Sequence, residues 1–130
     1  MTDRDALNQI TDVIIGAAIE VHRALGPGLL ESAYESCMVF EIVDRHRLKV
    51  EQQKPFPVIY RGVRLDCGYR LDLLVSDLVI VELKSVDRLL PIHEAQMLSY
   101  LKLSGCKVGL LINFNAKVLK DGIKRVVNKY

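Results

Sequence analysis

The fold of this chain follows from residues 69–84, YRLDLLVSDLVIVELK. The segments Tyr69–Val75 and Leu78–Lys84 are dominated by aliphatic side chains, and each has the length of a single strand. Ser76-Asp77, which separates them, has the composition of a tight two-residue turn. We therefore predict two neighbouring strands joined by that turn.

The charged residues of these two strands form a candidate site. Glu82 and Lys84 share one face of their strand because side chains alternate, whereas Leu83 points into the opposite layer. The turn brings Asp72, on the first strand, alongside the stretch Val81–Glu82. Two carboxylates this close repel each other unless one is protonated or a cation lies between them, and hard oxygen ligands suit Mg²⁺ or Mn²⁺ better than zinc. The alternative is a cross-strand ion pair, either Asp72–Lys84 or Arg70–Glu82.

Three helices are predicted around this segment. Apolar residues recur at steps of three and four over Leu7–Leu25, and Gly26-Pro27-Gly28 ends that pattern. A second helix is predicted from Leu29 to about Arg45. A third is predicted from Pro91 to about Ser104, because proline fits the first turn of a helix.

The remaining apolar segments predict further strands. Arg61-Gly62 predicts a hairpin, and Pro55 and Pro57 place its strand at a sheet edge or delay its start. A strand covered on both faces is predicted over Val108–Phe114. Asp121-Gly122 predicts a terminal hairpin between Val118-Leu119 and Ile123–Val127. The fold class is therefore α/β (α+β), with helices packed on a mixed sheet.

Three polar residues on the predicted helices are further candidates. Glu31 opens the second helix, where the alternative role of an acidic side chain is to complement the helix dipole. Gln96 and Tyr100 are four residues apart on the third helix and share a face. The alternative for these two is the solvated side of an amphipathic helix.

Length and composition narrow the class of protein. The 130 residues fit one domain, residues 1–130, with no repeat or linker. The longest apolar run, Val13–Ile19, is far shorter than the about twenty residues of a membrane span. The acidic start, with Asp3 and Asp5, does not resemble a secretory signal, so we expect a cytoplasmic protein. The three cysteines lack metal-site spacing and are expected to be buried or half-buried thiols.

The net charge of +2 indicates no particular partner, but the charge is unevenly distributed. Residues 101–130 contain seven Lys or Arg and one acidic residue, Asp121. This end of the chain either attracts a phosphate backbone or is simply a solvated hairpin.

Several segments together resemble a known family. The segment GLLESAY, residues 28–34, matches the motif of the GxxExxY proteins, a branch of the PD-(D/E)XK nuclease superfamily. The likeness extends over residues 14–28, 69–75, 81–84, 93–101 and 109–114, and so covers nearly the whole chain. One departure is Arg45-His46-Arg47, where such proteins often have glycine at the end of the second helix.

The resemblance implies a fold and a set of roles. The fold is an αβββαβ nuclease core with an extra N-terminal helix. Asp72 and Glu82 would be the central metal ligands, with Glu31 as a third carboxylate and the Leu83 carbonyl as a further ligand. Lys84 would orient or deprotonate the attacking water, and Gln96 and Tyr100 would brace the site or touch the nucleic-acid backbone.

Two functions from different classes follow. The first is a Mg²⁺- or Mn²⁺-dependent nuclease that acts on DNA, or less favourably on RNA. Arg70 would hold the phosphate in this nuclease, because residues two apart on a strand point to the same face and Arg70 therefore lies on the face of Asp72. The second is a non-catalytic module that binds nucleic acid or protein, since a fold does not prove a function. A purely structural subunit ranks last. Because the chain is small, we also expect a homodimer.

Overall fold

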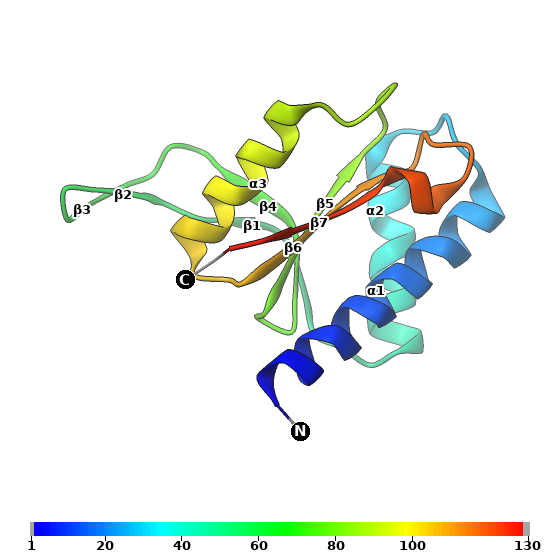
Figure 1. Ribbon diagram of the computed structural model, residues 1–130, viewed down its shortest axis with the longest axis horizontal. Coiled ribbons are helices and arrows are strands. Elements are labelled where there is room, and N and C mark those ends of the chain that lie inside the picture. Colours follow the sequence, from blue (N-terminus) through cyan, green and yellow to red (C-terminus); the bar gives the residue numbers. More distant parts are fainter. Residues whose placement is uncertain (1, 129–130) are drawn as a thin grey trace.

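A five-stranded mixed sheet forms the centre of the computed structural model, which describes residues 2–128. Its strand order is β1-β4-β5-β6-β7 (Figure 1). The strands β5 and β6 run parallel, and every other neighbouring pair is antiparallel. The strands span Val50–Pro55 (β1), Arg70–Val75 (β4), Val79–Lys84 (β5), Val108–Asn113 (β6) and Ile123–Val127 (β7).

Helices cover both faces of the sheet (Figure 1). The helices α1 (Asp3–Leu25) and α2 (Glu31–Val39) lie on one face, and α2 continues as a π-helical segment over Phe40–Arg45. The helix α3 (Pro91–Ser104) lies on the other face. None of the helices within residues 2–128 is long and apolar enough to cross a membrane. The predicted α/β (α+β) class and the αβββαβ order of α2, β1, β4, β5, α3 and β6 are confirmed.

The predicted turn between β4 and β5 lies at Ser76-Asp77 but is one residue longer than expected. Val75 pairs with Val79, so the loop is Ser76–Leu78, and Ser76 and Asp77 both have positive φ angles, 53° and 59°. All six residues of β6 are buried, and so are the first five of β5, because helices cover both faces of these central strands.

A hairpin projects from the body between β1 and β4 (Figure 1). Its strands β2 (Val58–Tyr60) and β3 (Val63–Leu65) pair only with each other, and we call residues 58–65 the arm. The chain leaves the central sheet at Pro55 and re-enters it at Arg70, and these two residues are directly paired. The prediction that Pro55 and Pro57 delay the start of the hairpin strand is confirmed, since β2 begins only at Val58 and Pro55 ends the separate edge strand β1.

The structure corrects two details of the sequence analysis. The C-terminal hairpin is formed by β6 and β7, and its first strand is not Val118-Leu119. Leu119 packs into the core and opens a short 3₁₀ helix, so the chain turns there and Ile123–Val127 pairs with β6 instead. Cys67 is exposed and therefore not a buried thiol, whereas Cys37 and Cys106 are half-buried as expected.

Candidate active site

The side chains of Asp72 on β4 and Glu82 on β5 each accept a hydrogen bond from the backbone of the other strand. The Asp72 N–H donates to Glu82 Oε2 at 2.7 Å, and the Leu83 N–H donates to Asp72 Oδ2 at 2.9 Å. Regular pairing of β4 with β5 ends at Leu73 and Val81. The two carboxylates therefore replace the backbone hydrogen bonds at the point where the strands separate, and their positions are fixed by main-chain groups.

This pair is electrostatically unfavourable without a cation. The Glu82 side chain is buried (residue exposure 5%), and its burial, together with the neighbouring charge of Asp72, raises its pKa to about 8. Burial also raises the pKa of Asp72. The positive charge of Lys84 opposes both changes. Glu82 consequently retains its proton near neutral pH unless a cation compensates the pair.

The ion pairs that the sequence offered as an alternative are not formed. Neither Asp72–Lys84 nor Arg70–Glu82 occurs among the salt bridges of residues 2–128. Arg70 instead donates a long hydrogen bond of 3.4 Å to the Gln53 carbonyl. The ammonium of Lys84 thus acts on both carboxylates without forming an ion pair with either.

The residues of the GxxExxY motif dock the start of α2 against the end of β5. Glu31 Oε2 accepts a hydrogen bond of 3.1 Å from the Ser85 N–H, directly after Lys84. The buried hydroxyl of Tyr34 donates to the Gly26 carbonyl at 2.6 Å and accepts from the Leu29 N–H at 3.1 Å. Tyr34 therefore fixes the loop before α2, and the helix begins with Glu31 directed at the strand that carries Glu82.

Two further residues, which the sequence analysis missed, support the site. Gln53 Nε2 on β1 donates to Asp72 Oδ1 at 3.3 Å and to Glu35 Oε1 on α2 at 2.7 Å. The negative charge of Glu35 also raises the pKa of Asp72 and of Glu82. The spacing of Glu31 and Glu35, one helical turn apart, was the only available signal. Gln53 gave none, because β1 was not predicted as a separate strand.

The two α3 candidates behave differently. Tyr100 is buried, packs edge-on against Phe56 with ring centroids 5.0 Å apart, and has a pKa raised first by burial and then by the charge of Glu82. It therefore lies near the carboxylate pair on the α3 side of the sheet. Gln96 is exposed, and its side chain makes no hydrogen bond within residues 2–128. The structure brings Tyr100 to the site and leaves Gln96 in solvent.

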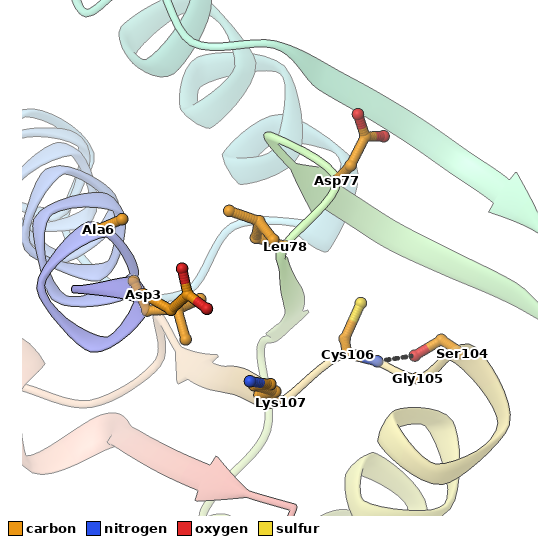
Figure 2. A pocket seen from close by; sticks show the side chains of 9 residues that line it. Asp3, Ala6, Asp77, Leu78, Ser104, Gly105, Cys106 and Lys107 are labelled. Atoms are coloured by element: carbon orange, nitrogen blue, oxygen red, sulfur yellow. Dashed lines mark hydrogen bonds between the residues drawn. The ribbon is translucent and has the colours of Figure 1, made fainter. Parts of the chain in front are cut away.

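A cavity of about 350 Å³ lies at the other end of the sheet (Figure 2). It is lined by the start of α1 and by the segments that precede β5 and β6, including Asp3, Leu78 and Lys107. Glu82 lies near the opposite end of β5, so this cavity contains none of the candidate site residues.

The family model of the PD-(D/E)XK nuclease superfamily matches residues 8–126. The chain belongs to this superfamily. Asp72 and Glu82-Leu83-Lys84 supply the letters of the superfamily's name, with Leu71 in place of the proline. A search of curated proteins and a search of solved structures gave no match to this PD-(D/E)XK domain.

The donor atoms of this PD-(D/E)XK site fit a hard divalent cation. Asp72 and Glu82 supply carboxylate oxygens, and the Leu83 carbonyl points to the same side of β5 as its N–H, toward Asp72. Mg²⁺ is commonly held by one or two carboxylates and several waters. Within the described part of the chain, however, no three Asp, Glu, His or Cys side chains gather into a metal-binding group. The role of Glu31 as a third carboxylate ligand therefore stays a prediction.

Proposed function

We propose that this PD-(D/E)XK domain is a nuclease that depends on Mg²⁺ or Mn²⁺ and hydrolyses phosphodiester bonds in DNA, with RNA as the less favoured substrate. The observation that carries the proposal is the buried pair of Asp72 and Glu82, interlocked through the backbone with Lys84 on the same strand face. A protein rarely maintains a buried carboxylate pair of this kind unless it binds or reacts with something.

Each residue of the site has a role that its position supports. Asp72 and Glu82 would hold the cation, with the Leu83 carbonyl and Glu31 as further ligands. When bound, the cation supplies positive charge opposite the phosphate and lowers the pKa of a bound water. Lys84, whose charge acts on both carboxylates, would orient or deprotonate that water and offset charge on the phosphate.

Two other side chains would act on the substrate from the margin of the site. Arg70 is exposed and has no carboxylate partner within residues 2–128, which suits a phosphate clamp. Tyr100, packed against Phe56, would brace the α3 side, and Gln96 is free to touch a nucleic-acid backbone.

We also place the chain in the GxxExxY branch of the superfamily. This placement is supported by the spacing of Gly28, Glu31 and Tyr34. The tyrosine hydroxyl holds the loop that contains the glycine, and the glutamate reaches the residue after Lys84. The three motif positions thus serve one purpose, which is to set the start of α2 against the site.

The competing function is a module that binds nucleic acid or protein without turnover. It is favoured by the fact that only two carboxylates converge in the described residues, because a weak metal site would limit catalysis. Salt-sensitive binding that survives the loss of both carboxylates, without cleavage, would support this alternative.

The test is cleavage of single-stranded DNA, duplex DNA and RNA with Mg²⁺ or Mn²⁺, using the wild type and the Glu82→Gln variant. This variant keeps an oxygen that can accept the Asp72 N–H hydrogen bond, so it removes the charge with little change in packing. We expect cleavage by the wild type, none in EDTA, and a loss of at least about a hundredfold in the variant. Equal rates in the two proteins, or no cleavage of any substrate, would count against a nuclease.

We further propose that the protein acts as a cytoplasmic homodimer. The small size of the domain and the unpaired outer edge of β7 support self-association, and three free cysteines suit a reducing compartment. Light scattering at high protein concentration tests the dimer, and a monomer would refute it.

A further inference from the structure

The arm exposes an apolar face. In its register Val58 lies opposite Leu65 and Tyr60 opposite Val63, so these four side chains share one face of the hairpin. Tyr60 is 59% exposed, Val63 55% and Leu65 42%. Ile59 and Arg64 occupy the other face, which borders a groove between the arm and the end of α3. A two-stranded hairpin is only marginally stable alone, and apolar side chains that face solvent do not stabilise it. Their exposure on the arm therefore indicates a surface that binds another molecule.

The charge of the arm indicates an anionic partner. Residues 58–65 contain Arg61 and Arg64 and no acidic residue. Neither arginine forms an ion pair within residues 2–128, whereas Arg23 is paired with Glu20. The Arg61 guanidinium lies over the Tyr60 ring, 5.6 Å from its centroid, so cation and aromatic surface are presented together.

The arm is continuous with the candidate site. At its base Tyr69 is 43% exposed, and its ring lies 6.1 Å from the ring of Tyr100, near the carboxylate pair. Arg70, also without a carboxylate partner, lies two residues before Asp72. Two tyrosines and three arginines, Tyr60, Arg61, Arg64, Tyr69 and Arg70, therefore lie along the chain between the tip of the arm and Asp72.

We infer that the arm binds an unpaired strand of nucleic acid and guides it to Asp72 and Glu82. Bases stack on the exposed rings of Tyr60 and Tyr69, and Arg61, whose guanidinium lies at the Tyr60 ring, contacts the phosphates. An exposed flat ring beside unpaired arginines favours a single strand, because the faces of bases inside a duplex are already stacked. The delivery of the strand to the carboxylates rests on the proposed nuclease function, whereas the binding does not.

The test is fluorescence anisotropy with a labelled oligothymidylate, measured in EDTA at several salt concentrations. We expect Tyr60→Ser to weaken binding about tenfold, the typical effect of removing one stacking ring, and Tyr60→Phe to leave it unchanged. The matched comparison is Val63→Ser, which removes apolar surface directly opposite Tyr60 but no ring, and we expect a clearly smaller loss than with Tyr60→Ser. The variant Arg61→Gln should reduce the logarithmic salt slope by about 0.7.

Three results would overturn the inference. The first is no binding, or binding that Tyr60→Ser leaves unchanged. The second is a preference for a blunt duplex of matched sequence. The third is a dimer, detected by light scattering, that both Tyr60→Ser and Val63→Ser dissociate while oligothymidylate binding persists, since the arm would then bind a second copy of the chain.

The experiment separates this inference from the nuclease proposal. Binding is measured without metal, and it can be repeated with Glu82→Gln, which removes a proposed ligand but leaves the arm intact. Binding that depends on Tyr60, combined with an absence of cleavage, would refute the nuclease and support the arm. Cleavage with normal efficiency in Tyr60→Ser, without a change in binding, would refute the arm and support the nuclease.

Discussion

We predict that the metal-free protein becomes less stable as the pH rises, because the buried Glu82 then loses its proton. The folded-state pKa of Glu82 is about 8, raised from an ordinary value of 4.5. Between these values the folded protein holds a proton that the unfolded chain releases, so the free energy of unfolding decreases with increasing pH. The contribution is fully present below about pH 4.5 and is lost as the pH rises through about 8.

The size of the stability change follows from the difference between the folded-state pKa of Glu82 and its ordinary value. At about 1.4 kcal/mol for each pH unit, the difference between 4.5 and about 8 corresponds to about 5 kcal/mol, as an upper estimate. Asp72, whose pKa is raised in the same direction, titrates together with Glu82 and spreads the change over a wider range. A small domain is typically stable by only about 5–15 kcal/mol, so the effect is readily measured.

The assay is urea denaturation in EDTA at a series of pH values between about 5 and 8.5, for the wild type and Glu82→Gln. The wild type should lose stability steadily, whereas the neutral variant should show a much flatter profile. Saturating Mg²⁺ should restore the wild type at about pH 8 and have little effect on the variant, because a ligand stabilises only the state that binds it. Parallel pH profiles for the two proteins would refute the reasoning.

Three further substitutions test the fold around the site by denaturation. Tyr34→Phe removes the hydroxyl that donates to the Gly26 carbonyl and should lower the free energy of unfolding by about 1–3 kcal/mol; an unchanged midpoint would contradict this role. Gly16→Ala, at an exposed helix position with open space around it, should stabilise by up to about 1 kcal/mol. Gly122→Ala places a Cβ 2.5 Å from the Asn113 carbonyl oxygen and should destabilise by about 1–3 kcal/mol, so a neutral result would show that this turn can move.

The central strands could be predicted from sequence because their burial is complete. Helices cover β5 and β6 on both faces, so their sequences are nearly continuous apolar runs. The edge strand β1 could not be predicted, because Glu51-Gln52-Gln53-Lys54 is polar and its pairing with β4 is a tertiary contact. The same reason explains why the partner of β7 was predicted wrongly. The strand β7 pairs with β6 across an intervening loop, and not with Val118-Leu119, which directly precedes its turn.

The proximity of Asp72 and Glu82 could be predicted because it is local. The short turn between β4 and β5 sets their register, and its three residues bring Asp72 next to Glu82, where the predicted two-residue turn would have set it opposite Val81. The sequence contained no indication that each carboxylate binds the backbone of the other strand, because that depends on where the ladder ends. It also could not reveal Gln53, which reaches Asp72 from a strand that is adjacent in space and 19 residues away in the chain.

The pairing of Pro55 with Arg70 has a consequence for how domains of this architecture can diversify. The chain leaves the sheet and returns to it at adjacent points on neighbouring strands, so the excursion between them closes on itself. A longer or shorter hairpin could be exchanged there as a cassette without changing the register of β1 and β4 or the position of Asp72. Replacing the arm, residues 58–65, with hairpins from other proteins is therefore a practical way to vary this projection while the buried Phe56 and the rest of the scaffold stay constant.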